Sequence, residues 1–172
     1  MPIFLTALIV AIADGLEPII ANFNRLGWNA PRRVFQSVAS GVLGRPSFDG
    51  GTPTALLGAA LHFTIALIWT AIYVLIIRKL GFVQRMMKTT GGLIALGAIY
   101  GIVIWCSMDY IVIPLSRATF TPPSNPAFWQ QLVWHAVGVG QLIVWLTERV
   151  FAREARGVTD EQSYGRHASS PA

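Results

Sequence analysis

The sequence predicts an all-α protein, a four-helix transmembrane bundle whose helices run up, down, up and down across a bilayer. Of its 172 residues, 53% are apolar and only 12% are charged, about half the charged fraction of a typical soluble domain. The mean hydropathy is +0.54, and four apolar segments approach the length of about 20 residues that crosses a hydrocarbon core. Polar and apolar residues do not alternate at period two, so helices are the expected spanning elements. This composition argues against a soluble enzyme, a disordered chain and a nucleic-acid-binding module.

The four expected spans are residues 3–23, 54–77, 91–113 and 127–151. Polar residues and Pro18 interrupt the first span, but no Lys/Arg-rich region precedes it, so we expect it to be retained rather than cleaved as a signal peptide. Pro114 ends the third span, and three further prolines fill the loop before the fourth. We therefore expect one transmembrane domain over residues 1–152, followed by a polar, disordered tail over residues 153–172.

The loop between the first two spans contains a predicted amphipathic helix over residues 31–43. Its apolar residues recur at helical spacing and are Val34, Phe35, Val38 and Val42. A helix of this kind lies in the outer headgroup region, with Arg32 and Arg33 directed toward lipid phosphates. Membrane lipid is therefore an expected partner, and the alternative is a loop helix that only caps the bundle.

The distribution of basic residues predicts the orientation. Eight Lys and Arg residues lie in the second loop and the tail, whereas five lie in the first and third loops. The excess favours cytoplasmic N- and C-termini. Because the formal net charge of +5 resides in these short flanks, it does not indicate nucleic acid as a partner.

Polar residues inside the spans form a predicted cluster near the outer half of the bilayer. With a helical rise of about 1.5 Å per residue, Asp14, His62 and His135 each lie about 12 to 13 Å below the outer face. Asp109 lies about 6 Å below that face, and Glu17 lies one turn above Asp14. Ionisable groups at such depths need partners or a function.

Several readings of this cluster remain open. The residues could be hydrogen-bonding partners that fix helix packing, or a proton sensor or relay, because histidine titrates between pH 5 and 8. His62 and His135 could instead ligate a haem between facing helices, and a quinone or lipid headgroup pocket is a further alternative. The sequence has a single cysteine, Cys106, and no C-x-x-C pattern, so it gives no indication of another metal site. If the cluster only fixes helix packing, no cofactor is expected.

Gly97 and Gly101 form a small-xxx-small face on the third span. Such a face packs helices together within one chain or between copies, so a homo-oligomer or a larger membrane complex is possible. The sequence contains no G-x-S-x-G, H-E-x-x-H, P-loop or dinucleotide-binding motif. We therefore expect no catalytic residues.

Three ordered strings resemble a family of small, uncharacterised bacterial four-helix membrane proteins. They are RRVFQSVASGVLG at 32–44, FDGGTPTALLGAALHFTIALIWTAIYVL at 48–75 and MDYIVIPLS at 108–116. The resemblance covers about residues 7–148, although that family usually has Asn where this chain has Asp109. More distantly, the helix around His62, the string PLSRATFTPP at 114–123 and His135 in a Trp-rich last helix are similar to YagU-type inner-membrane proteins linked to acid resistance.

The resemblance implies a non-enzymatic bacterial inner-membrane protein with an accessory or acid-stress role. Two other function classes stay open. One is a redox or accessory subunit that binds haem or quinone between His62 and His135. The other is a proton-coupled transporter, which would act as an oligomer because four helices leave little room for a path.

Overall fold

The computed structural model describes residues 2–119 and 121–168, and every regular element in these residues is helical. The α-helices are α1 (Pro2–Leu26), α2 (Ala30–Leu43), α3 (Gly51–Leu75), α4 (Gly81–Met86), α5 (Thr90–Ser107), α6 (Ile113–Leu115), α7 (Pro126–Trp134) and α8 (Gly140–Ala168). Short 3-10 turns follow α1, α2 and α3, and π-helical turns join α5 to α6 and α7 to α8. The all-α prediction is confirmed.

Three helical stretches are long and apolar enough to cross a membrane: Ile3–Leu43, Gly51–Lys79 and Thr90–Leu115. Their outer surfaces carry large exposed apolar side chains such as Ile20 and Leu56, which are 69% and 66% exposed. Contact of such a surface with lipid is favourable in free energy, whereas its exposure to water is unfavourable. The stretch from α7 to α8 falls outside this set because glutamines and a histidine interrupt its apolar run.

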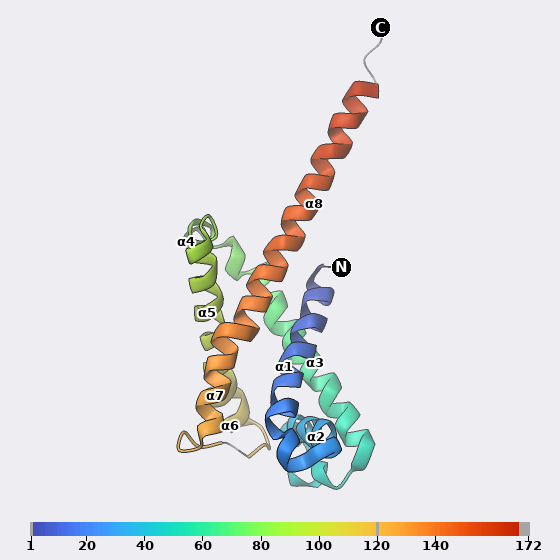
Figure 1. Ribbon diagram of the computed structural model, residues 1–172, viewed down its shortest axis with the longest axis vertical. Coiled ribbons are helices and arrows are strands. Elements are labelled where there is room, and N and C mark those ends of the chain that lie inside the picture. Colours follow the sequence, from blue (N-terminus) through green and yellow to red (C-terminus); the bar gives the residue numbers. More distant parts are fainter. Residues whose placement is uncertain (1, 120, 169–172) are drawn as a thin grey trace.

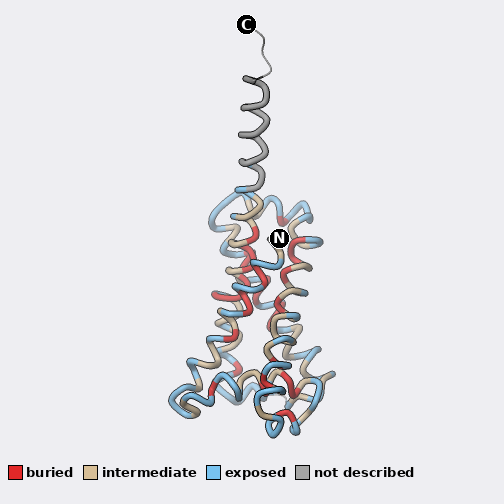
Figure 2. Tube along the Cα trace, turned by 90° about the vertical axis from the view of Figure 1, so that its right-hand side faces the viewer, coloured by how far each residue is buried: buried red, intermediate tan, exposed pale blue. Residues whose placement is uncertain are grey.

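The long helices form two pairs. α1 packs against α3, and α5 packs against α8 and the π-helical turn that precedes it. Figure 1 shows the pairs meeting near the middle of the molecule and diverging toward α2 and α6, and Figure 2 shows the same divergence from the side. α4 lies at the opposite end.

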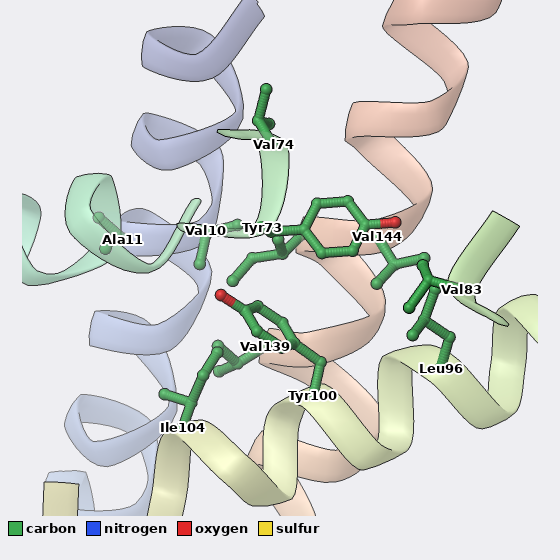
Figure 3. Packing of buried hydrophobic residues seen from close by; sticks show 12 residues of the cluster. Val10, Ala11, Tyr73, Val74, Val83, Leu96, Tyr100, Ile104, Val139 and Val144 are labelled. Carbon is green, nitrogen blue, oxygen red and sulfur yellow. The ribbon is translucent and has the colours of Figure 1, made fainter. Parts of the chain in front are cut away.

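A hydrophobic core closes the region where the pairs meet. Tyr73, Tyr100, Val139 and Val144 are almost fully buried there, and Figure 3 shows them side by side. The Tyr100 hydroxyl donates to the carbonyl of Trp69 over 2.6 Å, which joins α5 to α3. Burial of each such side chain stabilises the fold by about 1.5–3 kcal/mol.

Glycines allow α5 and α8 to approach closely. A Cβ on Gly101 would overlap the carbonyl of His135, and a Cβ on Gly140 would overlap the carbonyl of Gly97. The Gly97 and Gly101 face therefore packs against another part of the same chain, as small residues do at membrane helix contacts.

A helix occupies the segment where the sequence predicts one, but its buried face differs from the expected apolar one. Gln36 is 1% exposed and donates its amide to the carbonyl of Gly51 over 3.0 Å, whereas Val42 is 52% exposed. The reason is local, because α2 crosses α3 closely at Gly58, where a Cβ would overlap the carbonyl of Phe35. This crossing places Gln36 against the start of α3, where its side chain forms hydrogen bonds.

The C-terminal segment also differs from the expectation. The sequence predicts disorder from residue 153, whereas α8 continues to Ala168 and extends away from the bundle (Figure 1). No proline interrupts this segment, and its Arg, Glu, Ala and Gln residues have high helix propensity. Residues 169–172 of the expected tail lie outside the described residues.

Candidate functional site: a polar cluster in the cavity between the helix pairs

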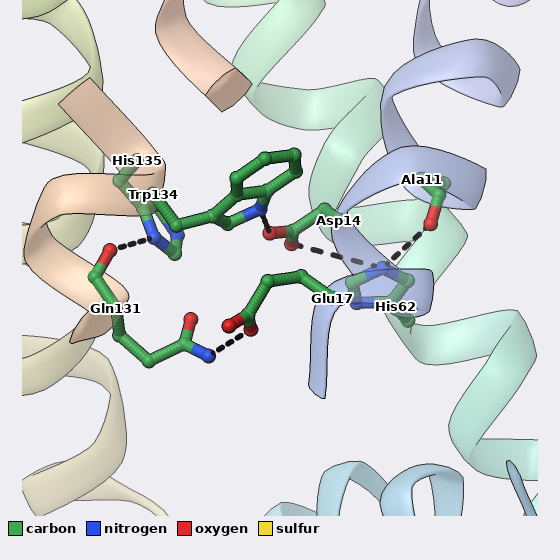
Figure 4. Close-up of polar contacts among 7 residues, drawn as sticks. All are labelled: Ala11, Asp14, Glu17, His62, Gln131, Trp134 and His135. Atoms are coloured by element: carbon green, nitrogen blue, oxygen red, sulfur yellow. Dashed lines mark hydrogen bonds and ion pairs between the residues drawn. The ribbon is translucent and has the colours of Figure 1, made fainter. Parts of the chain in front are cut away.

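Asp14 is the point at which three helices meet. One carboxylate oxygen, Oδ2, lies 3.8 Å from Nε2 of His62 on α3. The other, Oδ1, accepts a hydrogen bond of 3.0 Å from the indole N–H of Trp134 on α7. Figure 4 shows Asp14 between these two side chains. One carboxylate on α1 thus connects both helix pairs.

His62 is fixed by its neighbours. Its Nε2 donates to the carbonyl of Ala11 over 3.0 Å, one turn before Asp14 on α1. Gly15 leaves room for the ring, since a Cβ there would lie 3.5 Å from Nε2 and 3.4 Å from Phe35. The side chains of His62 and Asp14 are 17% and 20% exposed, so the contact is shielded from bulk solvent.

Glu17 joins α1 to α7 a second time. Its Oε2 accepts from the amide of Gln131 over 2.6 Å, and its Oε1 accepts from the amide of Gln130. Two neutral donors on one carboxylate satisfy a charge that would otherwise be costly at this depth. Glu17 and Asp14 therefore each connect α1 to α7 through hydrogen bonds of their own.

The remaining two cluster residues lie in π-helical turns. Asp109 belongs to Met108–Val112, and His135 belongs to His135–Val139. Such turns add one residue to a helical turn and recur at functional sites, because they redirect side chains. His135 donates from Nδ1 to the carbonyl of Gln131 over 2.8 Å and interacts electrostatically with Asp109.

A cavity of about 810 Å³ lies between the diverging helix pairs. Asp14, His62, Asp109 and His135 all line it. Apolar residues of the core, including Ile143, also line the cavity, and so do residues of α2 and of the segment after α6. A volume of this size matches the range of small-molecule sites.

The predicted headgroup-binding arginines have different surroundings. Arg33 lines the cavity and donates to the carbonyl of Phe48 over 3.0 Å. Arg32 is exposed and donates to the side chain of Asn29 over 2.9 Å. The two neighbours therefore have different partners within the protein, and their contact with lipid headgroups stays a prediction.

Among the described residues, no group of three or more His, Cys, Asp or Glu side chains could hold a metal ion. A haem between His62 and His135 would bind through the other ring nitrogens, His62 Nδ1 and His135 Nε2, because His62 Nε2 and His135 Nδ1 each donate to a backbone carbonyl. Cys106 is exposed.

A second polar site lies at the other end of the core. Arg78 donates from Nε and Nη2 to the two oxygens of Glu148, each over 3.1 Å, and the Tyr73 hydroxyl donates to Glu148 over 3.2 Å. The Arg78 guanidinium also lies 4.1 Å from the centre of the Phe151 ring. This ion pair connects the 3-10 turn after α3 to α8 at the closed end of the bundle.

Sequence reasoning found the acids and histidines but missed some of their partners. Trp134 and Gln130 are the clearest omissions, because neither is ionisable and neither stands out in a hydropathy profile. The sequence does offer a signal for Trp134. This residue lies beside His135, and its indole N–H needs a hydrogen-bond acceptor because it is surrounded by apolar residues.

Comparisons of the chain with protein-family models, with curated proteins and with solved structures found no match. The case for a function therefore depends on the cavity and on the residues that line it.

Proposed function

We propose that this chain is a non-enzymatic, four-span membrane protein whose helix pairs are connected in a proton-dependent way at Asp14. The observation that carries the proposal is the 3.8 Å contact between Asp14 and His62 in the wall of a cavity between the helix pairs. The fourth span would be the continuous stretch from α7 to α8, whose Gln131 and His135 face the cavity rather than lipid.

Protonation of His62 would change the character of this contact. Histidine side chains in general gain a proton between pH 8 and pH 5, and a carboxylate oxygen of Asp14 lies within ion-pair distance of the His62 ring. Acidification would then convert a contact of a neutral ring with a carboxylate into an ion pair between α1 and α3. The Trp134 bond to the same carboxylate would transmit this change to the second helix pair.

A proton-dependent connection suits the accessory or acid-stress role that the similarity to YagU-type proteins implies. In the proposed topology the cavity and α2 lie toward the outer face of a bacterial inner membrane, and both termini are cytoplasmic. The positive-inside bias supports this orientation. The cluster would therefore face the compartment that acidifies first.

A second candidate function is proton-coupled transport by an oligomer. The observation that favours it is the cavity itself, because a purely structural cluster does not require about 810 Å³ of space between helix pairs. The closed end at Arg78 and Glu148 would form the opposite boundary of a transport path.

The test is survival at low pH of bacterial cells that lack the protein and are complemented with variants at equal membrane levels. The His62→Gln variant keeps a donor for the Ala11 carbonyl but cannot take up a proton, so we expect it to lose protection. Thr64→Ala, on the same helix but exposed and bonded only to its own backbone, should protect fully. Full protection by His62→Gln would refute the acid role of this site.

A further inference from the structure

Asp109 is the cluster residue whose charge is least compensated. Within residues 2–119 and 121–168, no hydrogen bond reaches its carboxylate, which interacts electrostatically with His135. Asp14 and Glu17, by contrast, accept hydrogen bonds from Trp134 and from two glutamines. A carboxylate in a span without donors needs another source of positive charge.

The charged and titratable groups that line the cavity come from every element around it. They are Asp14 and Arg25 from α1, Arg33 from α2, His62 from α3, Asp109 from the turn after α5, and His135 from the turn after α7. The arginines have partners of their own, since Arg25 donates to Asn22 over 2.7 Å and Arg33 donates to Phe48. Arg25 also follows Asp14 by three helical turns, about 16 Å along α1.

Two carboxylates, two imidazoles and two arginines therefore line the cavity. While the imidazoles are neutral, the formal charges of the arginines and carboxylates cancel over the whole lining, but neither arginine bonds to Asp109. A cation bound beside Asp109 would compensate the charge of its carboxylate, and an anion bound there would add to that charge.

Aromatic side chains line the same cavity. Phe35, Trp69 and Phe128 come from α2, α3 and α7, and apolar residues of the core complete the wall. An aromatic face attracts a cation through its quadrupole, and aromatic walls with a carboxylate are the usual means of binding organic cations. A small hydrated metal ion would leave most of this apolar surface unused.

We propose that the cavity binds a lipophilic organic cation, a quaternary or aromatic ammonium or phosphonium compound, with Asp109 as its counter-ion. The proposal rests on the proposed function for the membrane setting of the cavity, and it adds the ligand class.

The experiment compares two probes of the same shape and opposite charge, tetraphenylphosphonium and tetraphenylborate. Equilibrium dialysis of the purified full-length protein in detergent at pH 8 should show binding of the phosphonium and much weaker binding of the borate. Asp109→Asn should weaken phosphonium binding at least about tenfold, since it removes the counter-charge. Asp109→Glu should retain affinity within about threefold.

Asp49→Asn serves as the matched control, because Asp49 is exposed and does not line the cavity. It should leave the affinity unchanged, and thermal melting should show that each variant is folded. Equal or stronger binding of the borate overturns the proposal, and so does failure of the phosphonium to bind. Unchanged affinity in a folded Asp109→Asn variant overturns it as well.

These outcomes are separable from those of the acid-survival test. Loss of protection in His62→Gln together with no phosphonium binding would leave the proton-dependent role standing and remove the ligand class. Phosphonium binding that depends on Asp109, with full acid protection by His62→Gln, would do the reverse.

Discussion

Replacement of Trp134 with phenylalanine removes the indole N–H that donates to Asp14 and keeps an aromatic ring on α7. The bond is 3.0 Å long and connects the two helix pairs, so its loss should destabilise the arrangement of the pairs more than any single helix. Asp14→Asn should cost less in the Trp134→Phe background than alone, because Asp14→Asn removes the charge of the acceptor and Trp134→Phe removes the donor of the same hydrogen bond.

The size of this coupling follows from the kind of bond. Hydrogen bonds between membrane helices contribute about 0.6 kcal/mol on average and about 1.7 kcal/mol at most. The Asp14 bond belongs near the upper value, because its acceptor is a carboxylate and both side chains are partly buried. We therefore expect a coupling free energy of about 1.5 kcal/mol.

The assay is a double-mutant cycle of unfolding free energies, measured by SDS titration in mixed micelles. Trp129→Phe is the matched control, because its indole N–H donates to the exposed carbonyl of Pro123, at the end of the loop before α7. The control should show no coupling to Asp14→Asn. Additivity of Trp134→Phe and Asp14→Asn within about 0.3 kcal/mol would refute the proposed connection.

Three further predictions follow from other contacts. Gly101→Ala should lower the unfolding free energy by about 2–3 kcal/mol because a methyl group meets the backbone of the facing turn, whereas Gly81→Ala, with open space around it, should change it by less than about 1 kcal/mol. Glu148→Gln should cost about 1–2 kcal/mol because Arg78 loses a two-bond acceptor, and Lys88→Gln, at an exposed position, should be nearly neutral in the same titration. A topology reporter fused to the C-terminus should be active only if it is of the cytoplasmic type, and periplasmic activity would invert the proposed topology.

The depth of the polar residues could be predicted from the sequence because helical rise and bilayer thickness fix it. Asp14 and His62 are 48 positions apart in the chain, yet the same estimated depth puts them at one level, and their side chains lie 3.8 Å apart. Helix rotation and tilt do not follow from such counting. The divergence of the helix pairs, and hence the cavity, therefore emerges only from the structure.

Other features depend on contacts that local pattern does not encode. The π-helical turns at Asp109 and His135 shift the helical phase, so a face computed at 100° per residue no longer applies beyond them. Gln36 is buried because the start of α3 offers it acceptors, although its polarity predicts exposure. In each case a tertiary contact overrides the local preference.

The proposed proton dependence of the contact between Asp14 and His62 is tested most directly by the unfolding free energies of the wild type and His62→Gln, compared at about pH 8 and about pH 5 in the same detergent. If an ion pair between His62 and Asp14 forms on acidification, only the wild type can gain it, because the Gln side chain takes up no proton. We expect acidification to stabilise the wild type relative to His62→Gln by about 1 kcal/mol. Identical pH profiles for the two proteins, or a relative loss of wild-type stability on acidification, would contradict it.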